Sequence, residues 1–385
     1  WEDDIAPALG PELVAVVTAD LKPVVLLQPE DEDKLTALLE KGDEEVVRGE
    51  TGDWVVLATT QEDLTAYLAA RERATLEDDV KLAAGLEALP EESLAKLWVD
   101  VEAVSSRADE FLGQQAEALD VGIDWMSMAV AAEENGMLVA MGVRTPGGGS
   151  SRYEPELFAQ VPEDAVVAMS FGGTQGTLDR LRGGTSLDDI SAEVEKATGI
   201  SLDSVVDALS GEGVLYVRPS GGRVPDVTLA LRPPDPSDTF QTVDRAARKL
   251  AEQTETQVRT ATEFGVEVSS LEVEDVTIKY GRADDRTVVI TTGNSAFSAL
   301  TTGGAKLVDS DGFERASGDV GLEGLTNGFV YVDIDGLLPL VESIAGDEAV
   351  PPDVRDGIEA FDSFILVAAG EGDTTTVRGF LRVND

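Results

Sequence analysis

The chain of 385 residues contains neither cysteine nor histidine. The first absence excludes disulfides and thiolate metal sites, and the second excludes any catalytic scheme in which imidazole is the base. Aromatic residues make up only 5% of the chain, which disfavours a glycosidase, since such an enzyme needs aromatic sugar platforms beside two close carboxylates. The chain also lacks any apolar run of about 18 residues, so the sequence predicts no membrane-spanning helix within it.

Positive charge is scarce as well. The sequence has 29 Lys+Arg against 75 Asp+Glu, a formal net charge of −46. The acidic residues are spread along the whole length rather than gathered in a tail, which is typical of a solvated surface. A field of this sign repels phosphate backbones and anionic headgroups, so we expect no nucleic-acid partner.

What the chain does contain is a repeated pattern. The β-branched and aromatic run at 329–333 has an earlier version at 97–101, and each leads into an acidic turn followed by a helical pattern. Other strand-like segments recur in the same order, namely 24–28 with 227–232, 54–59 with 287–292, and the hairpin 126–143 with 364–383. Several motifs in one order indicate an internal duplication.

The sequence therefore predicts an α+β fold made of tandem duplicated units, each an antiparallel-rich sheet with amphipathic helices packed on one face. Residues 1–144 form the first predicted unit, a Gly/Ser/Pro-rich linker covers 145–155, and 156–385 form the second. We expect the two copies to superpose. The first unit has no counterpart of the strand at 165–171, and the chain begins at Trp1, so we expect that strand upstream of Trp1.

Several acidic stretches invite a metal interpretation. The segment 309–314 resembles part of a calcium loop, but Leu307 and Gly318 stand where an EF-hand needs acids. Its counterpart at 76–81, and the acidic stretch 30–33, also precede helical patterns, where carboxylates stabilise the helix N-terminus. The sequence thus favours helix starts over metal sites at these positions.

Asp100 and Asp333 are the best carboxylate pair by repetition, since each ends a corresponding strand. We predict that they cap the following helices and that backbone N–H donors lower their pKa. Gly172–Thr177 could cradle an anion but lacks the lysine of a phosphate loop. Gly293–Phe297 follows a strand as a nucleophile elbow does, but its second glycine is missing. We assign no catalytic, cofactor-binding or metal-ligating residue.

Softer motifs carry a family resemblance. The segments Val161–Ala165, Gly199–Leu202 leading to Leu209–Glu212, and Val377–Leu381 resemble a family of exported actinobacterial proteins catalogued as domain of unknown function 3352. The resemblance implies an extracytoplasmic location, with an anchor in the cytoplasmic membrane contributed by a segment outside this chain. It implies no activity.

We therefore expect a non-enzymatic binding or interaction domain at the bacterial cell envelope, whose partner is a protein or an apolar ligand. Two alternatives stay open: a carrier that holds a lipid or other apolar ligand between sheet and helices, and a carboxylate-dependent hydrolase. An apolar cavity of several hundred Å³ favours the carrier. Convergent buried carboxylates with raised pKa favour the hydrolase. A filled core with a flat exposed patch favours the interaction domain.

Overall fold

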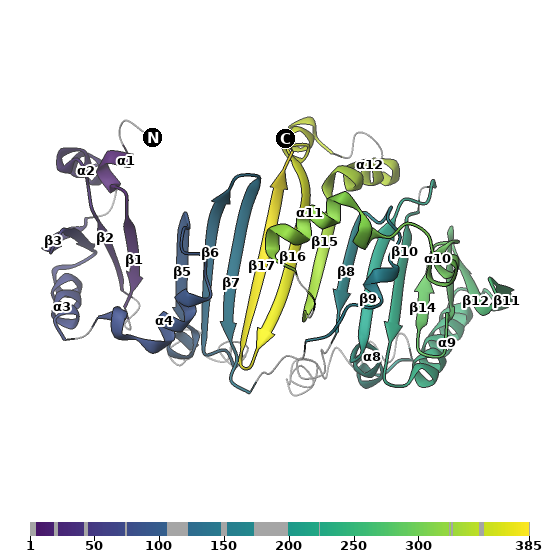
Figure 1. Cartoon of the computed structure of the whole chain (residues 1–385). Coiled ribbons are helices and arrows are strands. Elements are labelled where there is room, and N and C mark those ends of the chain that lie inside the picture. The colour runs from purple at the N-terminus through teal and green to yellow at the C-terminus, as the bar shows by residue number, and fades with distance from the viewer. Residues whose placement is uncertain are drawn as a thin grey trace. The chain divides into compact units, whose positions relative to one another are not determined.

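The structure is a computed structural model that describes residues 5–18, 22–41, 45–73, 75–105, 122–147, 152–172, 199–222, 224–322, 324, 326–345 and 350–384. The chain divides into two compact units (Figure 1). Unit 1 comprises residues 1–86 with 100–121, and unit 2 comprises 87–99 with 122–385. Among the described helices, none is long and apolar enough to cross a membrane.

Unit 1 is built on a four-stranded antiparallel sheet with the strand order β1-β2-β4-β3. Its helices are short and alternate with the strands along the chain. Its elements are α1 (Ala6–Leu9), β1 (Leu13–Val17), β2 (Pro23–Leu27), α2 (Glu32–Leu39), β3 (Val47–Thr51), β4 (Trp54–Ala58), α3 (Gln61–Arg71), η1 (Leu76–Asp78) and α4 (Val80–Glu87).

Helices cover both faces of this sheet, so the predicted one-face arrangement is wrong. Leu27 and Leu57 point to the face where Leu35 of α2 packs. Their neighbours Leu26 and Val56 point to the other face, where α3 packs. The unbroken apolar runs of β2 and β4 are typical of strands buried on both faces, and that signal in the sequence was missed.

Unit 2 contains a thirteen-stranded antiparallel sheet, in the order β11-β12-β13-β14-β10-β9-β8-β15-β16-β17-β7-β6-β5. Its strands are β5 (Ala95–Asp100), β6 (Trp125–Glu133), β7 (Gly136–Arg144), β8 (Val167–Phe171), β9 (Glu212–Arg218), β10 (Asp226–Arg232), β11 (Arg259–Glu263), β12 (Val266–Val273), β13 (Val276–Arg282), β14 (Val288–Thr291), β15 (Gly328–Asp333), β16 (Phe361–Glu371) and β17 (Thr374–Val383). A large antiparallel sheet with helices confirms the predicted α+β class.

The helices of unit 2 also lie on both faces of its sheet. On β13, Tyr280 donates a hydrogen bond to Asp244 of α9, whereas a Cβ on Gly281 would meet the ring of Phe297 in α10. Neighbouring residues of a strand point to opposite faces. Helix α11 crosses the sheet near β16 and β17 (Figure 1). The helices are η3 (Phe158–Gln160), α8 (Leu202–Leu209), α9 (Pro236–Gln253), α10 (Ala296–Thr302), η4 (Leu307–Asp309), α11 (Asp311–Val320), α12 (Ile334–Ala345) and α13 (Pro352–Ile358).

The strand order of unit 1 recurs inside unit 2. The order β1-β2-β4-β3 has the connectivity of β9-β10-β14-β13. The registers also correspond. Val17 pairs with Pro23 as Val217 pairs with Val227. In the hairpins β6-β7 and β16-β17, residues at corresponding positions of the repeat also pair with each other. This agreement supports the duplication, which itself stays a prediction.

The compact units do not end at the boundary predicted from the repeats. The hairpin of β6 and β7 belongs to the sheet of unit 2, where β7 pairs with β17 from Arg144↔Thr374 to Gly136↔Arg382. Residues 148–151 of the predicted linker lie outside the described residues. The described linker residues are attached to unit 2, since Tyr153 bridges Thr326.

Candidate functional site

A hollow of ≈700 Å³ lies in unit 2, and we call it the aromatic hollow. Its floor consists of Phe158 from η3, Phe313 from α11 and Phe329 from β15. The ring centroid of Phe158 lies 4.6 Å from that of Phe329 and 4.8 Å from that of Phe313. Leu322 and Val308 line the walls.

Local signals in the sequence place these rings. Ser310 caps α11, because its Oγ accepts a hydrogen bond from the N–H of Phe313 at 3.3 Å. This cap begins the helix so that Phe313 points inward beside Ala316 and Val320, all of them buried. Phe329 lies on the inward face of β15, where alternate residues are buried.

A buried ion pair holds η3 beside the sheet. The Oε2 of Glu212 lies 3.1 Å from Nη1 of Arg232, and both side chains are only 12–13% exposed. Glu212 also accepts a hydrogen bond from the N–H of Leu157. Burial raises the pKa of Glu212, opposed by this N–H and by Arg232. Glu212 is therefore a positioning group, which ties the start of η3 to β9 and β10.

The rim of the aromatic hollow is mainly acidic. Arg232 is its one basic lining residue among the described residues, and it already lies 2.6 Å from Oε2 of Glu156. Glu154 and Glu314 complete the charged rim. An apolar floor beneath an acidic rim suits a molecule with an apolar body and a neutral or cationic end.

A second, smaller hollow of ≈320 Å³ contains Ser295, the serine of the elbow-like segment. The Oγ of Ser295 accepts a hydrogen bond from Nη1 of Arg218 at 3.0 Å, and Nη2 of Arg218 lies 2.7 Å from Asp164. A guanidinium donates and cannot take the proton of a serine, so this contact does not activate Ser295. Lys306 donates to the carbonyls of Gln160 and Ala299, each at 3.1 Å, and burial lowers its pKa.

Asp100 and Asp333 cap helices as predicted. The Oδ1 of Asp100 accepts from the N–H of Ala103 at 2.8 Å, and that of Asp333 accepts from Gly336 at 2.9 Å. The predicted lowering of pKa is wrong for Asp333. Burial raises its pKa, Asp335 and Asp362 add to the rise, and the single N–H donor opposes it.

The other acidic stretches also begin helices. Asp79 accepts from the N–H groups of Lys81 and Leu82 at 2.8 and 3.0 Å. Asp31 accepts from Lys34 at 3.1 Å and so caps α2. Helix-start chemistry is therefore confirmed at these positions. Of the segment Gly172–Thr177, which the sequence analysis weighed as an anion cradle without the lysine of a phosphate loop, only Gly172 lies among the described residues.

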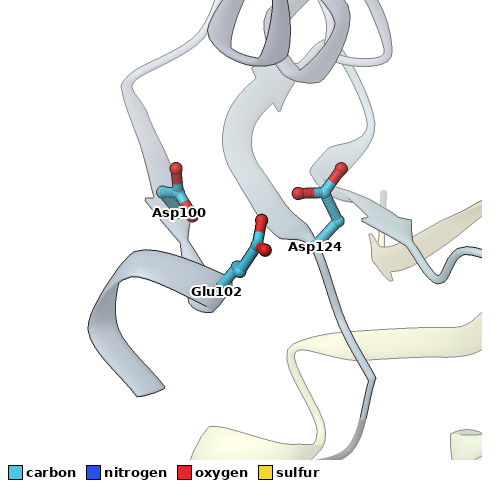
Figure 2. A group of neighbouring side chains, drawn as sticks. All are labelled: Asp100, Glu102 and Asp124. Carbon is cyan, nitrogen blue, oxygen red and sulfur yellow. The ribbon is translucent and has the colours of Figure 1, made fainter. Parts of the chain in front are cut away.

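Figure 2 shows three further acids, Asp100, Glu102 and Asp124. Asp100 and Glu102 belong to unit 1, and Asp124 belongs to unit 2. Within unit 1, Nζ of Lys81 lies 2.9 Å from Glu102 and 3.7 Å from Asp100. Within unit 2, Asp124 lies 3.4 Å from Nε of Arg144.

Comparison with known families gives one extensive match. Residues 34–383 match the sequence model of the family described as "Protein of unknown function (DUF3352)". The chain belongs to this family. This match confirms the family resemblance predicted from the sequence. The family carries no assigned activity.

Comparison with solved structures finds distant similarity only. Crystal form I of TP0453 aligns with a TM-score of 0.31 and 10% identity, over 60% of this chain and 80% of that chain. Crystal form IV of TP0453 aligns with a TM-score of 0.31 and 12% identity, over 60% of this chain and 94% of that one. At these TM-scores the similarity carries no argument. A search of curated proteins finds no significant match.

The aromatic hollow was not predicted from the sequence. Its three rings come from segments around positions 158, 313 and 329, and only the last of these was recognised as a buried strand. The one available signal was the apolar triplet Leu157-Phe158-Ala159 between Pro155 and Pro162, which is too short to show a period. Nothing in the sequence indicated that η3 would lie against α11.

Proposed function

We propose that this chain is a non-enzymatic binding domain of the bacterial cell envelope, and that it holds an apolar molecule in the aromatic hollow. The observation that carries the proposal is the hollow itself, ≈700 Å³ in volume with Phe158, Phe313 and Phe329 at its floor. Ligand pockets typically enclose about 300–1,000 Å³ and are lined mainly by apolar side chains with a few polar groups. The extracytoplasmic, membrane-anchored location is part of the proposal and derives from the family resemblance.

The acidic rim restricts the charge that the exposed end of a ligand can carry. Among the described lining residues there are three carboxylates, those of Glu154, Glu156 and Glu314, and one guanidinium, that of Arg232. The net charge of −46 adds a repulsive field for anions over the whole chain. We therefore propose a ligand whose exposed end is neutral or cationic, which separates it from free fatty acids.

The hydrolase alternative receives less support from the described residues. Four described carboxylates have a raised pKa, and three of them have a structural partner: Glu212 has Arg232, Asp319 has Arg382, and Asp333 has the N–H of Gly336. Burial raises the pKa of the fourth, Asp226, and the charge of Arg218 opposes the rise. Acid and base catalysis needs two such groups facing one reacting atom. The arrangement of the first three favours positioning and capping roles.

Titration with the neutral fluorophore N-phenyl-1-naphthylamine tests the proposal. We expect a saturable rise in fluorescence with one site per chain. Ala159 lines the hollow with an exposed side chain, so Ala159→Trp should fill it and weaken binding about tenfold, which corresponds to about 1.4 kcal/mol. The matched control is Ala66→Trp on α3, another exposed alanine, which should bind as the unchanged chain does.

Competition between two amphiphiles of equal chain length tests the charge argument. Dodecyltrimethylammonium should displace the fluorophore at a lower concentration than dodecanoate does, because the rim is acidic. A lack of saturable fluorescence, or Ala159→Trp binding like the unchanged chain, would contradict the aromatic hollow as the site. Preference for dodecanoate would contradict only the proposed polarity of the ligand.

A further inference from the structure

Among the described residues of unit 1, no strand pairs with the outer edge of β1, and β1 itself contains no charged residue or proline. Natural sheets protect edge strands with charges, prolines or bulges. Of the four edge strands of the two described sheets, β3, β5 and β11 each carry charged residues, whereas β1 reads Leu-Val-Ala-Val-Val. Three of its five residues expose large apolar side chains, with Leu13 at 51%, Val14 at 43% and Val17 at 66%.

The corresponding strand of unit 2 has a partner at this same edge. Strand β9 pairs with β10 in the register that β1 keeps with β2, and its other edge is occupied by β8. Val214 and Tyr216 of β9, which correspond to Val14 and Val16, are fully buried there. Strand β9 thus has both a neighbouring strand at this edge and side chains that cover its face, whereas the corresponding edge of β1 is unpaired.

The backbone hydrogen-bonding groups of β1 are oriented as those of β9 are. Thr18 donates its N–H to the carbonyl of Lys22 at 2.9 Å, which marks a hydrogen-bonded pair between β1 and β2. Because such pairs alternate in an antiparallel ladder, Leu13, Ala15 and Val17 direct their N–H and C=O groups to the open edge. In unit 2 the corresponding carbonyl, that of Val217, accepts from the N–H of Val166 at 2.9 Å.

We propose that the open edge of β1 docks one extended, antiparallel strand with the small-and-apolar chemistry of β8. In the register of β8 on β9, Met169 lies opposite Leu215 and Ala168 opposite Tyr216, so the docked strand places a large apolar residue opposite Ala15 and a small one opposite Val16. This inference does not depend on the aromatic hollow, which lies in unit 2.

One position of the docked strand must differ from β8. Phe171 lies opposite Gly213, and a Cβ on that glycine would come within 2.2 Å of the Phe171 ring. The corresponding residue of β1 is Leu13, which fills that space. The strand that docks on β1 therefore carries a small residue opposite Leu13.

Hydrogen exchange on the full chain tests the proposal, with a synthetic peptide of residues 162–172 carrying Phe171→Ala as the probe. We expect the probe to slow exchange at the amides of Leu13, Ala15 and Val17, the three that face the open edge. The amides of Val14 and Val16 face β2 and should change little. The peptide with the original Phe171 should bind about tenfold more weakly or worse, because its ring meets Leu13.

Ala15→Pro removes the central outward N–H without touching the bonds to β2, and proline is tolerated at such edges. It should weaken probe binding about tenfold or more, while far-ultraviolet circular dichroism and the slow exchange of Val14 and Val16 stay unchanged. Ala15→Gly keeps the N–H and should keep binding. Absence of protection at saturating probe, or equal binding by Ala15→Pro, overturns the proposal. Protection of the same amides by self-association without the probe also overturns it, in favour of a second copy.

Discussion

The sheet β1-β2-β4-β3 of unit 1 and the strands β9-β10-β14-β13 of unit 2 share one connectivity and register but have different cores. In unit 1 two small aliphatic clusters lie on the two faces. In unit 2 a larger cluster contains Phe297, Tyr216 and the rings of the aromatic hollow. The backbone frame is thus compatible with either core, and the side chains that cover it decide which one forms.

One position shows how this works. A Cβ on Gly49 of β3 would lie 3.0 Å from the methyl groups of Leu64, and a Cβ on Gly281 of β13 would lie 3.2 Å from the ring of Phe297. In both sheets a glycine leaves room for the first large residue of the following helix. Both sheets have this space beside the glycine. Leucine fills it in unit 1, and phenylalanine fills it in unit 2.

The largest expected effect comes from emptying that space. Phe297→Ala should lower the free energy of unfolding by about 3–5 kcal/mol, because the ring is 1% exposed and its removal leaves a cavity. Leu64→Ala, at 3% exposure, should cost about 2–5 kcal/mol in unit 1. Urea denaturation followed by circular dichroism measures both. If either change costs less than about 1 kcal/mol, the contact between the large side chain and the glycine beside it is not a core contact.

A smaller effect is expected at the corresponding helix caps. Asp235 accepts from the N–H groups of Ser237 and Asp238 at 3.0 and 2.9 Å, whereas Asp31 caps α2 through the N–H of one described residue, Lys34. Replacing either by Ala should cost about 0.5–2 kcal/mol, with Asp235→Ala at the upper end. Replacing either by Asn should cost little, since Asn caps about as well. Equal losses for Asn and Ala would show that charge, rather than capping, is what matters.

Sequence reasoning recovered most of the strands, though not β3 or β11, and it recovered the helix caps, because periodicity and turn chemistry are local signals. It failed where a contact joins distant segments. Phe158 and Phe313 meet only after both sheet and helices have formed. It also placed the helices on one face, although the apolar runs of β2 and β4 already indicated two buried faces. The raised pKa of Asp333 was not predicted for a related reason: it results from burial, which is a tertiary property.

The helix cap Asp333 gives a prediction that depends on pH. Burial raises the pKa of Asp333, so the folded state binds this proton more tightly than the unfolded state does. Its charged form therefore costs stability above the folded pKa, and that cost disappears as the pH falls through it. Asp333→Asn should cap Gly336 equally well and should be as stable as the unchanged chain, or more stable, at pH 7.

Thermal melts of the unchanged chain and Asp333→Asn between pH 7 and pH 4 measure this difference. The advantage of the variant should shrink as the pH falls. An advantage that grows on acidification would mean that the pKa is lowered, as the capping argument alone had predicted.

The smallest expected effect is that of salt, and it acts on both units. At most 29 of the 75 acids can have their own basic partner, so an excess of 46 negative charges repels itself at any geometry. Raising sodium chloride from about 10 to 150 mM shortens the Debye length from about 30 to about 8 Å, which screens this repulsion more than it weakens contacts such as Arg48–Glu32 at 2.7 Å. We therefore expect the melting temperature to rise over this range at pH 7.

Near the isoelectric point of ≈4.1 the same step in salt should have little effect, because the net repulsion is gone. A melting temperature at pH 7 that stays constant or falls with salt would show that local pairing of the acids outweighs their collective repulsion.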